Sequence, residues 1–301
     1  MQSLSSICDS ALYAKQRLGV ESELVLIANG MSQTQVQYLR HLLSKFDFLR
    51  TGLHSLKERG ISEALNLGLQ ESQGDHIARV DDDDFYDVRR LTLQYEKFQA
   101  DPKLVLLGTN GLKVDSEGRP LKNMIYPLEN ESIQQSLEIQ NCFIHSSVMM
   151  KRSAVSEVGG YSNKFDGVED YHLWVRLAAM GRLANLADSL TFHRRHVNQI
   201  SGNGHSQQDQ RIKEIMKIQY LNRSNRPTGI FIDLYTRNII SCRYNFYAAR
   251  LSLVQHNPSK LKFIQLSLRA LIINPFDLVR CVMTMFADKS FLNTLQSVIR
   301  N

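Results

Sequence analysis

Residues 74–84 read Gly-Asp-His-Ile-Ala-Arg-Val-Asp-Asp-Asp-Asp, so that an apolar segment runs directly into four adjacent carboxylates. Residues 76–80 have the length and side chains of a strand, and Gly74 ends the helical pattern before it. In open α/β sheets, ligands collect at the carboxyl ends of the strands. We therefore expect the four aspartates to lie at the ligand-binding edge of such a sheet.

Strand-like and helix-like patterns alternate around this segment. Residues 23–28 form a β-rich run before it, and residues 61–71 carry apolar side chains at helical spacing. Residues 89–100 then read as a helix and residues 104–108 as an apolar strand. This alternation predicts an α/β fold with an open, mainly parallel sheet and helices on its faces.

The rest of the chain separates into two parts. A loop over 115–131, a strand over 143–151 and a helix over 171–180 are expected first, followed by helical spacing throughout the tail. The sequence thus predicts an α/β domain over residues 1–205 and an α-helical region over residues 206–301.

The charge distribution supports the same division. The 301 residues carry a net charge of +6. Residues 1–205 hold 22 Lys and Arg against 25 Asp and Glu, a net of −3, whereas residues 206–301 hold 14 against 5, a net of +9. Lys260, Lys262 and Arg269 lie among apolar residues, a pattern typical of a helix on an anionic membrane surface. The alternative is that these helices pack on the first domain. No nucleic-acid partner is expected, because a recognition module is absent.

Composition excludes several classes of protein. A hydrophobic content of 43% rules out a disordered chain, and no apolar run approaches the roughly 18 residues of a spanning helix. We expect a cytoplasmic protein. The cysteines lack a CxxC pair, so we expect reduced thiols rather than a zinc site or a disulfide framework; they are Cys8, Cys142, Cys242 and Cys281.

Two carboxylate groups carry the predicted chemistry. The aspartates at 81–84 repel one another, and a hard divalent cation bound to phosphate would offset that repulsion. The alternative is a solvated acidic loop or a helix N-cap. Glu169 and Asp170 precede an amphipathic helix, where capping explains one carboxylate but not both. One group for metal and another for proton abstraction is the division of labour of a group-transfer enzyme.

Several ordered motifs resemble those of family two glycosyltransferases with the GT-A fold. The segments 60–69 and 74–84 are similar to the family's G-x-x-x-A-L-N-x-G and G-E-Y-I-A-R-M-D-A-D-D text. Asn141-Cys142-Phe143-Ile144-His145-Ser146-Ser147-Val148-Met149 is similar to N-P-F-x-H-P-S-V-M. The motifs at 159–161, 169–177 and 181–182 follow in family order, so the resemblance covers residues 20–200. The resemblance is to inverting members of the family that act in bacterial surface-polysaccharide synthesis.

The resemblance implies roles for individual residues. Asp81 and Asp83 match the DXD motif, and Asp84 matches the Asp that follows it. Together they would hold Mn²⁺ or Mg²⁺ against the diphosphate of a nucleotide-sugar, whereas Asp82 would have no role in binding. Asp170 would be the general base, and Glu169 would orient the base or touch the acceptor. The remaining assignments are donor binding by Arg79, Asp81, Asn66 and Asn29, acceptor binding by His145 and Trp174, and a metal contact by His196. The spacing of Trp174 is also typical of a core residue.

The sequence departs from the family at its beginning. The family's first strand, V-S-V-I-I-P-V-Y-N, has no counterpart, and Met1–Arg17 already resembles the helix that follows it. Where the family has V-D-D-G-S, this chain has Ala28 and Asn29. We therefore expect a GT-A domain without its first strand, either because the start lies upstream or because the enzyme is shortened.

These observations predict a metal-dependent hexosyltransferase. It would move a sugar from a nucleotide-sugar, a UDP-hexose, to a glycan or polyprenyl-linked acceptor in O-antigen, lipopolysaccharide or capsule synthesis, at the inner face of the cytoplasmic membrane. One rival is another metal-dependent nucleotide-sugar enzyme such as a nucleotidyltransferase, although the Gly-rich phosphate loop it needs is absent. The other is a non-catalytic remnant that acts as an interaction subunit.

Overall fold

The computed structural model describes residues 2–58, 60–138, 140–195, 211–212 and 214–216. The helices are α1 (Gln2–Leu18), α2 (Gln33–Leu43), α3 (Ile61–Glu71), α4 (Arg90–Ala100), α5 (Asn130–Leu137), α6 (Arg152–Glu157) and α7 (Glu169–Leu177), with short 3₁₀ turns η1 (His145–Ser147) and η2 (Asn163–Phe165). The strands are β1 (Glu23–Asn29), β2 (Arg50–Leu56), β3 (His76–Ala78), β4 (Phe85–Tyr86), β5 (Leu104–Val114), β6 (Pro120–Met124), β7 (Met149–Lys151) and β8 (Arg182–Arg194).

The strands form two sheets rather than one. β1 and β2 make a parallel pair, and a six-stranded sheet follows the order β3-β7-β5-β8-β4, with β6 also paired to β5. The two long ladders, β1–β2 and β5–β8, are parallel, but the four shorter ones are antiparallel. The expected α/β class is confirmed, whereas the expected mainly parallel sheet is corrected to a mixed one. Only the β5–β6 pair is joined by a short turn; the other three antiparallel ladders join strands that are far apart in the sequence.

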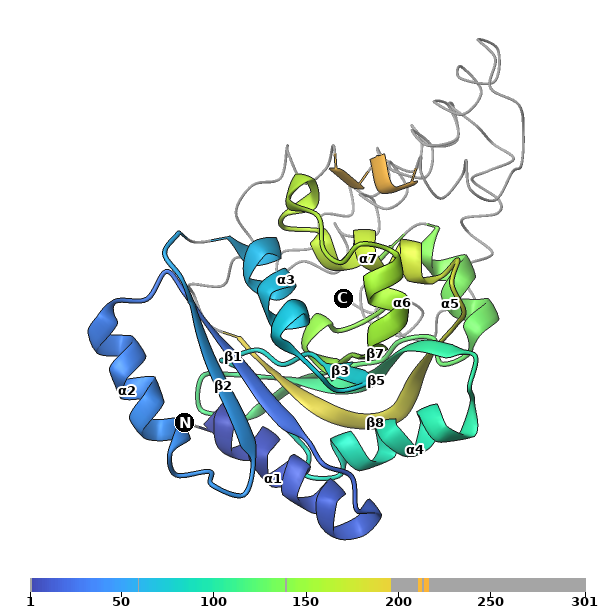
Figure 1. Cartoon of the computed structure of the whole chain (residues 1–301). Coiled ribbons are helices and arrows are strands. Elements are labelled where there is room, and N and C mark those ends of the chain that lie inside the picture. The colour runs from blue at the N-terminus through green and yellow to red at the C-terminus, as the bar shows by residue number, and fades with distance from the viewer. Residues whose placement is uncertain (1, 59, 139, 196–210, 213, 217–301) are drawn as a thin grey trace. The chain divides into compact units, whose positions relative to one another are not determined.

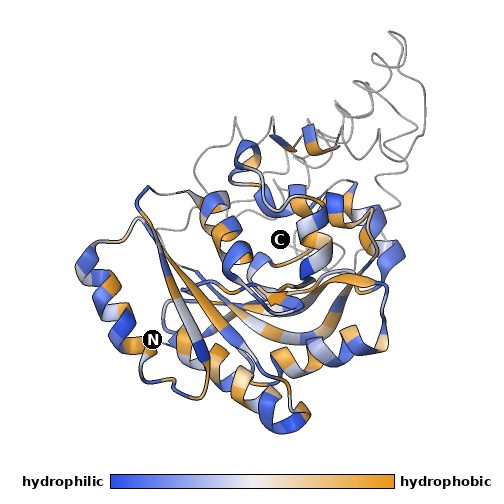
Figure 2. Cartoon of the chain, viewed as in Figure 1, coloured by the Kyte–Doolittle hydropathy of each residue, from blue (hydrophilic) through white to orange (hydrophobic). Residues whose placement is uncertain are grey.

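Helices cover both faces of the sheets (Figure 1). α3, α6 and α7 lie above them in this view and α1 and α4 below, while α2 lies outside β2. α2 begins with a capping box in which Ser32 and Gln35 exchange side-chain and backbone hydrogen bonds. Hydrophilic residues predominate on α2 in Figure 2, in agreement with its largely exposed side chains.

The core is deepest along β5. Eight consecutive residues of this strand, Leu104–Gly111, are buried, and Leu106 and Leu107 are 0% exposed. Continuous burial identifies a strand covered on both faces. β5 was predicted to end at residue 108, but its pairing with β8 continues to Val114. Thr109 and Asn110 enter the core because their side chains find backbone partners.

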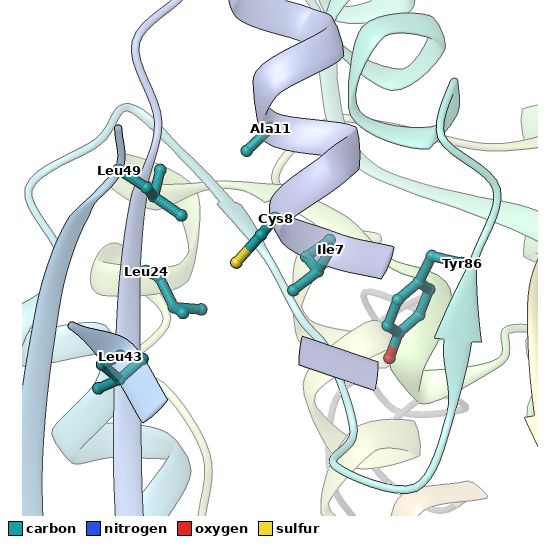
Figure 3. Close-up of a cluster of buried hydrophobic side chains, with 7 residues drawn as sticks. All are labelled: Ile7, Cys8, Ala11, Leu24, Leu43, Leu49 and Tyr86. Atoms are coloured by element: carbon teal, nitrogen blue, oxygen red, sulfur yellow. The ribbon is translucent and has the colours of Figure 1, made fainter. Parts of the chain in front are cut away.

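A second core joins β1 to the six-stranded sheet. Figure 3 shows Ile7 and Cys8 of α1 between Leu24 of β1 and Tyr86 of β4. Burial raises the pKa of the Cys8 thiol to about 11, so this thiol is protonated at neutral pH. Cys8 and Cys142 are free and buried, as predicted; the other two cysteines lie outside the described residues.

A break separates β1 from β3. No ladder joins the two strands: β1 pairs with β2 in one sheet, and β3 pairs with β7 in the other. Only Leu24 and Ala28 of β1 are buried, and β3 has no buried residue. This break agrees with the expected absence of the family's first strand, because an inner strand leaves two unpaired edges when it is missing.

The chain groups into two compact units. The first contains residues 1–124 and 143–201, and the second contains residues 125–142 and 202–301. The first unit ends close to the predicted boundary at residue 205, but 125–142 group with the tail. Of the tail, residues 211–212 and 214–216 are helical, and the other predicted tail helices lie outside the described residues. No helix in the described part of the chain is both long and apolar enough to cross a membrane.

Candidate active site

The acidic loop follows β3 directly. One carboxylate oxygen from each of Asp81, Asp83 and Asp84 lies within 4.8 Å of the others. Asp82 is exposed and outside this group. The Ser3 hydroxyl donates a hydrogen bond of 2.7 Å to the carbonyl oxygen of Asp81. The structure thus brings the three predicted metal ligands together, and oxygen ligands of this kind suit Mg²⁺ or Mn²⁺.

Asp84 is the anchored member of the group. It is 0% exposed, and its carboxylate accepts hydrogen bonds from the Ser146 hydroxyl, from Nδ1 of His193 at 3.1 Å and from the backbone N–H of Arg194 at 2.9 Å. Burial alone would raise the pKa of Asp84, but these hydrogen bonds and the His193 charge hold that pKa below its ordinary value. Asp84 therefore stays ionised and fixes the loop to β8.

Arg79 lies between the acidic loop and the rest of the site. Its guanidinium forms an ion pair with Asp81, and its side chain is 12% exposed. Its Nε has no hydrogen-bond partner within the described residues. A buried donor without a partner is costly, so this atom is available to an anion that enters the site.

The second carboxylate group begins α7. Val168 is the N-cap residue and makes no side-chain cap, while Glu169 and Asp170 occupy the first turn. Glu169 Oε2 accepts a hydrogen bond of 2.6 Å from the N–H of Gly167. Neither carboxylate is therefore the N-cap residue, although both lie in the first turn, where negative charge stabilises the helix dipole. Glu169 is 5% exposed, and Asp170 is half-buried.

A buried network surrounds Glu169. His145 Nδ1 lies 3.9 Å from Glu169 Oε1, and His145 Nε2 shares a hydrogen bond of 3.0 Å with the Tyr161 hydroxyl. Burial and the Arg79 charge lower the pKa of His145 well below its ordinary value. Burial and the Asp170 charge raise the pKa of Glu169 to about 7. His145 is therefore neutral at pH 7 and does not form an ion pair with Glu169.

Trp174 supports this network from behind. Its ring contacts the rings of His145 and Phe143, with centroid distances of 5.7 and 5.9 Å. Trp174 is 0% exposed. The sequence assigned Trp174 to acceptor binding, but its indole is enclosed by the core and reaches the site only through His145. This position agrees with the alternative that helical spacing suggested.

The turn η1 connects the two carboxylate groups. His145 contacts Glu169, and the next residue, Ser146, donates to Asp84. Adjacent side chains of one three-residue turn thus lie against both segments, one by a hydrogen bond to Asp84 and the other by a contact with Glu169. The sequence predicted a strand over 143–151, whereas only Met149–Lys151 is a strand. The 3₁₀ turn forms because the Ser147 hydroxyl and N–H both donate to the carbonyl oxygen of Ile144.

Asn66 and Asn29 use their side chains within the fold. Asn66 Nδ2 donates to the carbonyl oxygen of Tyr161 at 2.9 Å, and its Oδ1 accepts from the Tyr161 N–H at 2.8 Å. The Asn29 amide makes two hydrogen bonds of 3.2 Å with the backbone of Gly60. Asn66 lies in the middle of α3 and Asn29 at the end of β1, and their donor-binding roles stay predictions.

Arg194 assembles the loop from several sides. Its guanidinium donates to the carbonyl oxygens of Asp83 and Ser116 and to Oε1 of Gln2. It also lies over the Phe85 ring, 5.2 Å from the centroid. Arg194 is therefore a structural element of the site.

Three residues of this site were not assigned from the sequence. Ser146 and Tyr161 occur in segments that resembled the family, and His193 stands in the His-Arg-Arg-His run at 193–196. The signal for His193 was that run, but the metal role was given to His196, which lies outside the described residues.

A cavity elsewhere in the molecule does not coincide with this site. It has a volume of about 570 Å³ and is lined by Asp75, His76, Leu104 and Lys151 among others. These residues lie where β3 and β5 begin, whereas the acidic loop lies beyond the end of β3. The site described here is therefore defined by its carboxylates.

Comparison with known proteins agrees with this geometry. The model for glycosyl transferase family 2 matches residues 6–159, just over half of the chain. The chain is 34% identical to the amylovoran biosynthesis glycosyltransferase AmsE of Erwinia amylovora over 44% of this chain and 50% of AmsE. It is 31% identical to the O-antigen biosynthesis glycosyltransferase WbnJ of Escherichia coli over 58% of this chain and 68% of WbnJ.

Two further comparisons are more distant. A UDP-Gal:alpha-D-GlcNAc-diphosphoundecaprenol beta-1,3-galactosyltransferase of Escherichia coli is 27% identical over 42% of this chain and 45% of its own length. The crystal structure of S. aureus TarS in complex with UDP-GlcNAc is similar in fold, with a TM-score of 0.60, 14% identity, and coverage of 93% of this chain and 76% of that one. The chain thus spans only half of AmsE, yet its motifs, its GT-A fold and the family match agree: it belongs to glycosyl transferase family 2.

Proposed function

We propose that the chain transfers one hexose from a UDP-sugar to a lipid-linked glycan, with inversion, during surface-polysaccharide synthesis. The observation that carries this proposal is the connection of two carboxylate groups through His145 and Ser146 of η1. One group suits a metal and a diphosphate, and the other suits proton abstraction. Support for the pathway comes from the relatives named for amylovoran, for O-antigen and for a diphosphoundecaprenol acceptor.

The donor end is formed by the acidic loop and Arg79. Asp81 and Asp83 would hold Mn²⁺ or Mg²⁺, and the buried Asp84 would keep the loop in place. A divalent cation bound there supplies positive charge that stabilises the departing nucleoside diphosphate. The Arg79 guanidinium, whose Nε has no partner in the described chain, would donate to a phosphate oxygen.

The acceptor end is formed by α7 and His145. Asp170 would accept the proton of the acceptor hydroxyl as that oxygen forms its bond to the anomeric carbon, while the bond from this carbon to the diphosphate breaks. Glu169 is more buried than Asp170 and has a raised pKa, so its role is to position the acceptor and His145. A protein nucleophile is not needed for a single displacement.

Metal dependence provides the test. Mn²⁺ or Mg²⁺ should restore the transfer that a chelator abolishes, measured as release of nucleoside diphosphate across a panel of nucleotide-sugars. Asp83→Ala should lower the rate at least about a thousandfold, corresponding to roughly 4 kcal/mol, whereas Asp82→Ala at the exposed neighbouring position should change it less than threefold. Full activity in excess chelator would refute the metal role.

The same panel separates the rival functions. A non-catalytic remnant would give no metal-dependent release with any nucleotide-sugar while still melting as a folded protein. A nucleotidyltransferase would release pyrophosphate from a nucleoside triphosphate instead of a nucleoside diphosphate from a nucleotide-sugar.

The basic region at 206–301 motivates a membrane proposal. Its net charge of +9 would hold the enzyme reversibly on the inner face of the cytoplasmic membrane, at about 1 kcal/mol for each Lys or Arg near anionic lipid. Replacing Lys260, Lys262 and Arg269 together by Gln should reduce sedimentation with anionic vesicles at low salt. Equal binding of the unaltered protein to neutral and anionic vesicles would refute the electrostatic tether.

A further inference from the structure

Three cations, Lys113, Lys122 and Arg195, border the acidic loop on the side of β6. Lys113 on β5 pairs with Lys122 on β6 in one ladder and with His193 on β8 in the other. His193 in turn binds Asp84. Residues directly opposite each other in a sheet project to the same face, so the two lysines extend from the side of β5 and β8 that carries His193.

This arrangement is unfavourable without an anion. Like charges directly opposite each other on paired strands are destabilising. Burial, together with the positive charges of Arg195 and Lys122, lowers the pKa of Lys113. Among the described residues, no ion pair joins a carboxylate to Lys113, Lys122 or Arg195.

The carboxylates of the nearby turn at 115–119 already have a cationic partner. Asp115 and Glu117 both form ion pairs with Arg119. Asp115 also accepts hydrogen bonds from the backbone N–H groups of Glu117 and Arg119. The turn is thus closed on itself, and the charges of Lys113 and Lys122 remain uncompensated.

We propose that Lys113, Lys122 and Arg195 form a subsite for the diphosphate of the lipid-linked acceptor. This inference rests on the proposed function, which places the donor diphosphate on the acidic loop. A second diphosphate that approached the first would be repelled unless it had cations of its own. Adjacent strands lie about 4.8 Å apart, so the row from His193 to Lys122 spans roughly 10 Å, which suits a diphosphate beside the reacting groups.

Inorganic pyrophosphate is the probe for this subsite. The full chain is freed of metal on a chelating resin and titrated with pyrophosphate by calorimetry. The double substitution Lys113→Gln with Lys122→Gln should weaken this binding at least tenfold. The matched control, Lys45→Gln with Lys103→Gln, removes the same charge from exposed positions and should change it less than twofold. Arg195→Gln, with a thermal melt of each variant, repeats the test if the double variant does not fold.

Two further titrations distinguish the sources of the anion. UDP in the presence of Mn²⁺ reports on the donor site, and its affinity should change less than twofold in the double variant. Vesicles of phosphatidylglycerol report on binding to a lipid surface. The double variant and the control variant should bind these vesicles equally well. Equal losses for UDP and pyrophosphate would assign the cations to the donor. Unchanged pyrophosphate binding, with or without a loss of vesicle binding, would overturn the proposal.

The proposed function can fail separately. If no nucleotide-sugar is used but the double variant still loses pyrophosphate binding, the anion subsite is real and the transfer reaction is wrong.

Discussion

The β5–β8 half of the first unit and the β1–β2 pair are built from the same kind of parallel ladder, but they are buried to different extents. β5 has eight consecutive buried residues, while β1 has two and β2 has none. η1 and α7, which carry the acceptor network, contact β5. The β1–β2 pair is held by α1 and α3 instead. The proposed chemistry thus depends on the more buried β5–β8 half, called the rigid half below, whereas the donor-binding role of Asn29 on β1 stays a prediction.

The largest expected effect tests whether the chemistry belongs to the rigid half. Asp170→Asn keeps the size of the side chain but removes its ability to take a proton at useful pKa. We expect at least about a thousandfold loss of turnover, with UDP affinity within twofold and the melting temperature nearly unchanged. Turnover is measured under saturating donor. A variant that unfolds, yet keeps its turnover per folded molecule, would show that Asp170 is structural.

Leucine truncations compare the two halves directly. Leu107 on β5 is 0% exposed, so Leu107→Ala should lower the free energy of unfolding by about 3–4 kcal/mol. Leu53 on β2 is only partly buried, and Leu53→Ala should cost about 1 kcal/mol. Urea denaturation measures both. Equal costs would mean that the β1–β2 pair is as tightly packed as β5, and the comparison would fail.

The pH dependence of stability gives the smallest effect. The pKa of Glu169 is raised from 4.5 to about 7, so the folded chain holds this proton more tightly than the unfolded chain. Stability should therefore fall as the pH rises from 4.5 through 7, by on the order of 3 kcal/mol at most. Glu169→Gln should remove this loss. The free energy of unfolding of the variant, relative to that of the parent protein, should therefore be higher above pH 7 than at pH 4.5.

The control for that experiment is a carboxylate in solvent. Glu157→Gln, at an exposed position near the end of α6, should give the same difference in melting temperature at pH 5 and pH 8. If Glu169→Gln behaves identically, the Glu169 carboxyl group does not carry a burial penalty, and this corner of the rigid half is wetter than its packing indicates.

The sequence was sufficient where the deciding interactions are local. α3 was predicted over the residues it occupies, because its apolar spacing is contained in one segment. The three aspartates were grouped correctly, because they share one loop. The sequence was insufficient where contacts between distant segments determine the local structure. β6 lies within a stretch predicted as a loop, and it is a strand because β5 continues far enough to pair with it.

The candidate site shows the same limit. His193 could not be paired with Asp84 from the sequence, since 109 positions separate them. Trp174 was ambiguous, because helical spacing does not say which side chains face a core and which face a ligand. In the structure Trp174 is 0% exposed, which favours the core position. No signal in the sequence pointed to Lys113 or Arg195, because only the β5–β8 ladder brings their strands side by side.

The Arg194 contacts have a consequence for the order of events during synthesis. This side chain joins Gln2, at the beginning of the chain, to Asp83 and Ser116, and its N–H holds Asp84. Translation proceeds at about 5–20 residues per second, so residue 194 is made roughly 10–40 s after Gln2 and about 6–22 s after Asp83. During these intervals α1 and the acidic loop lack the Arg194 contacts. A ribosome that stalls before β8 would thus hold a nascent chain in which the β1–β2 pair is complete while the acidic loop has no anchor on β8.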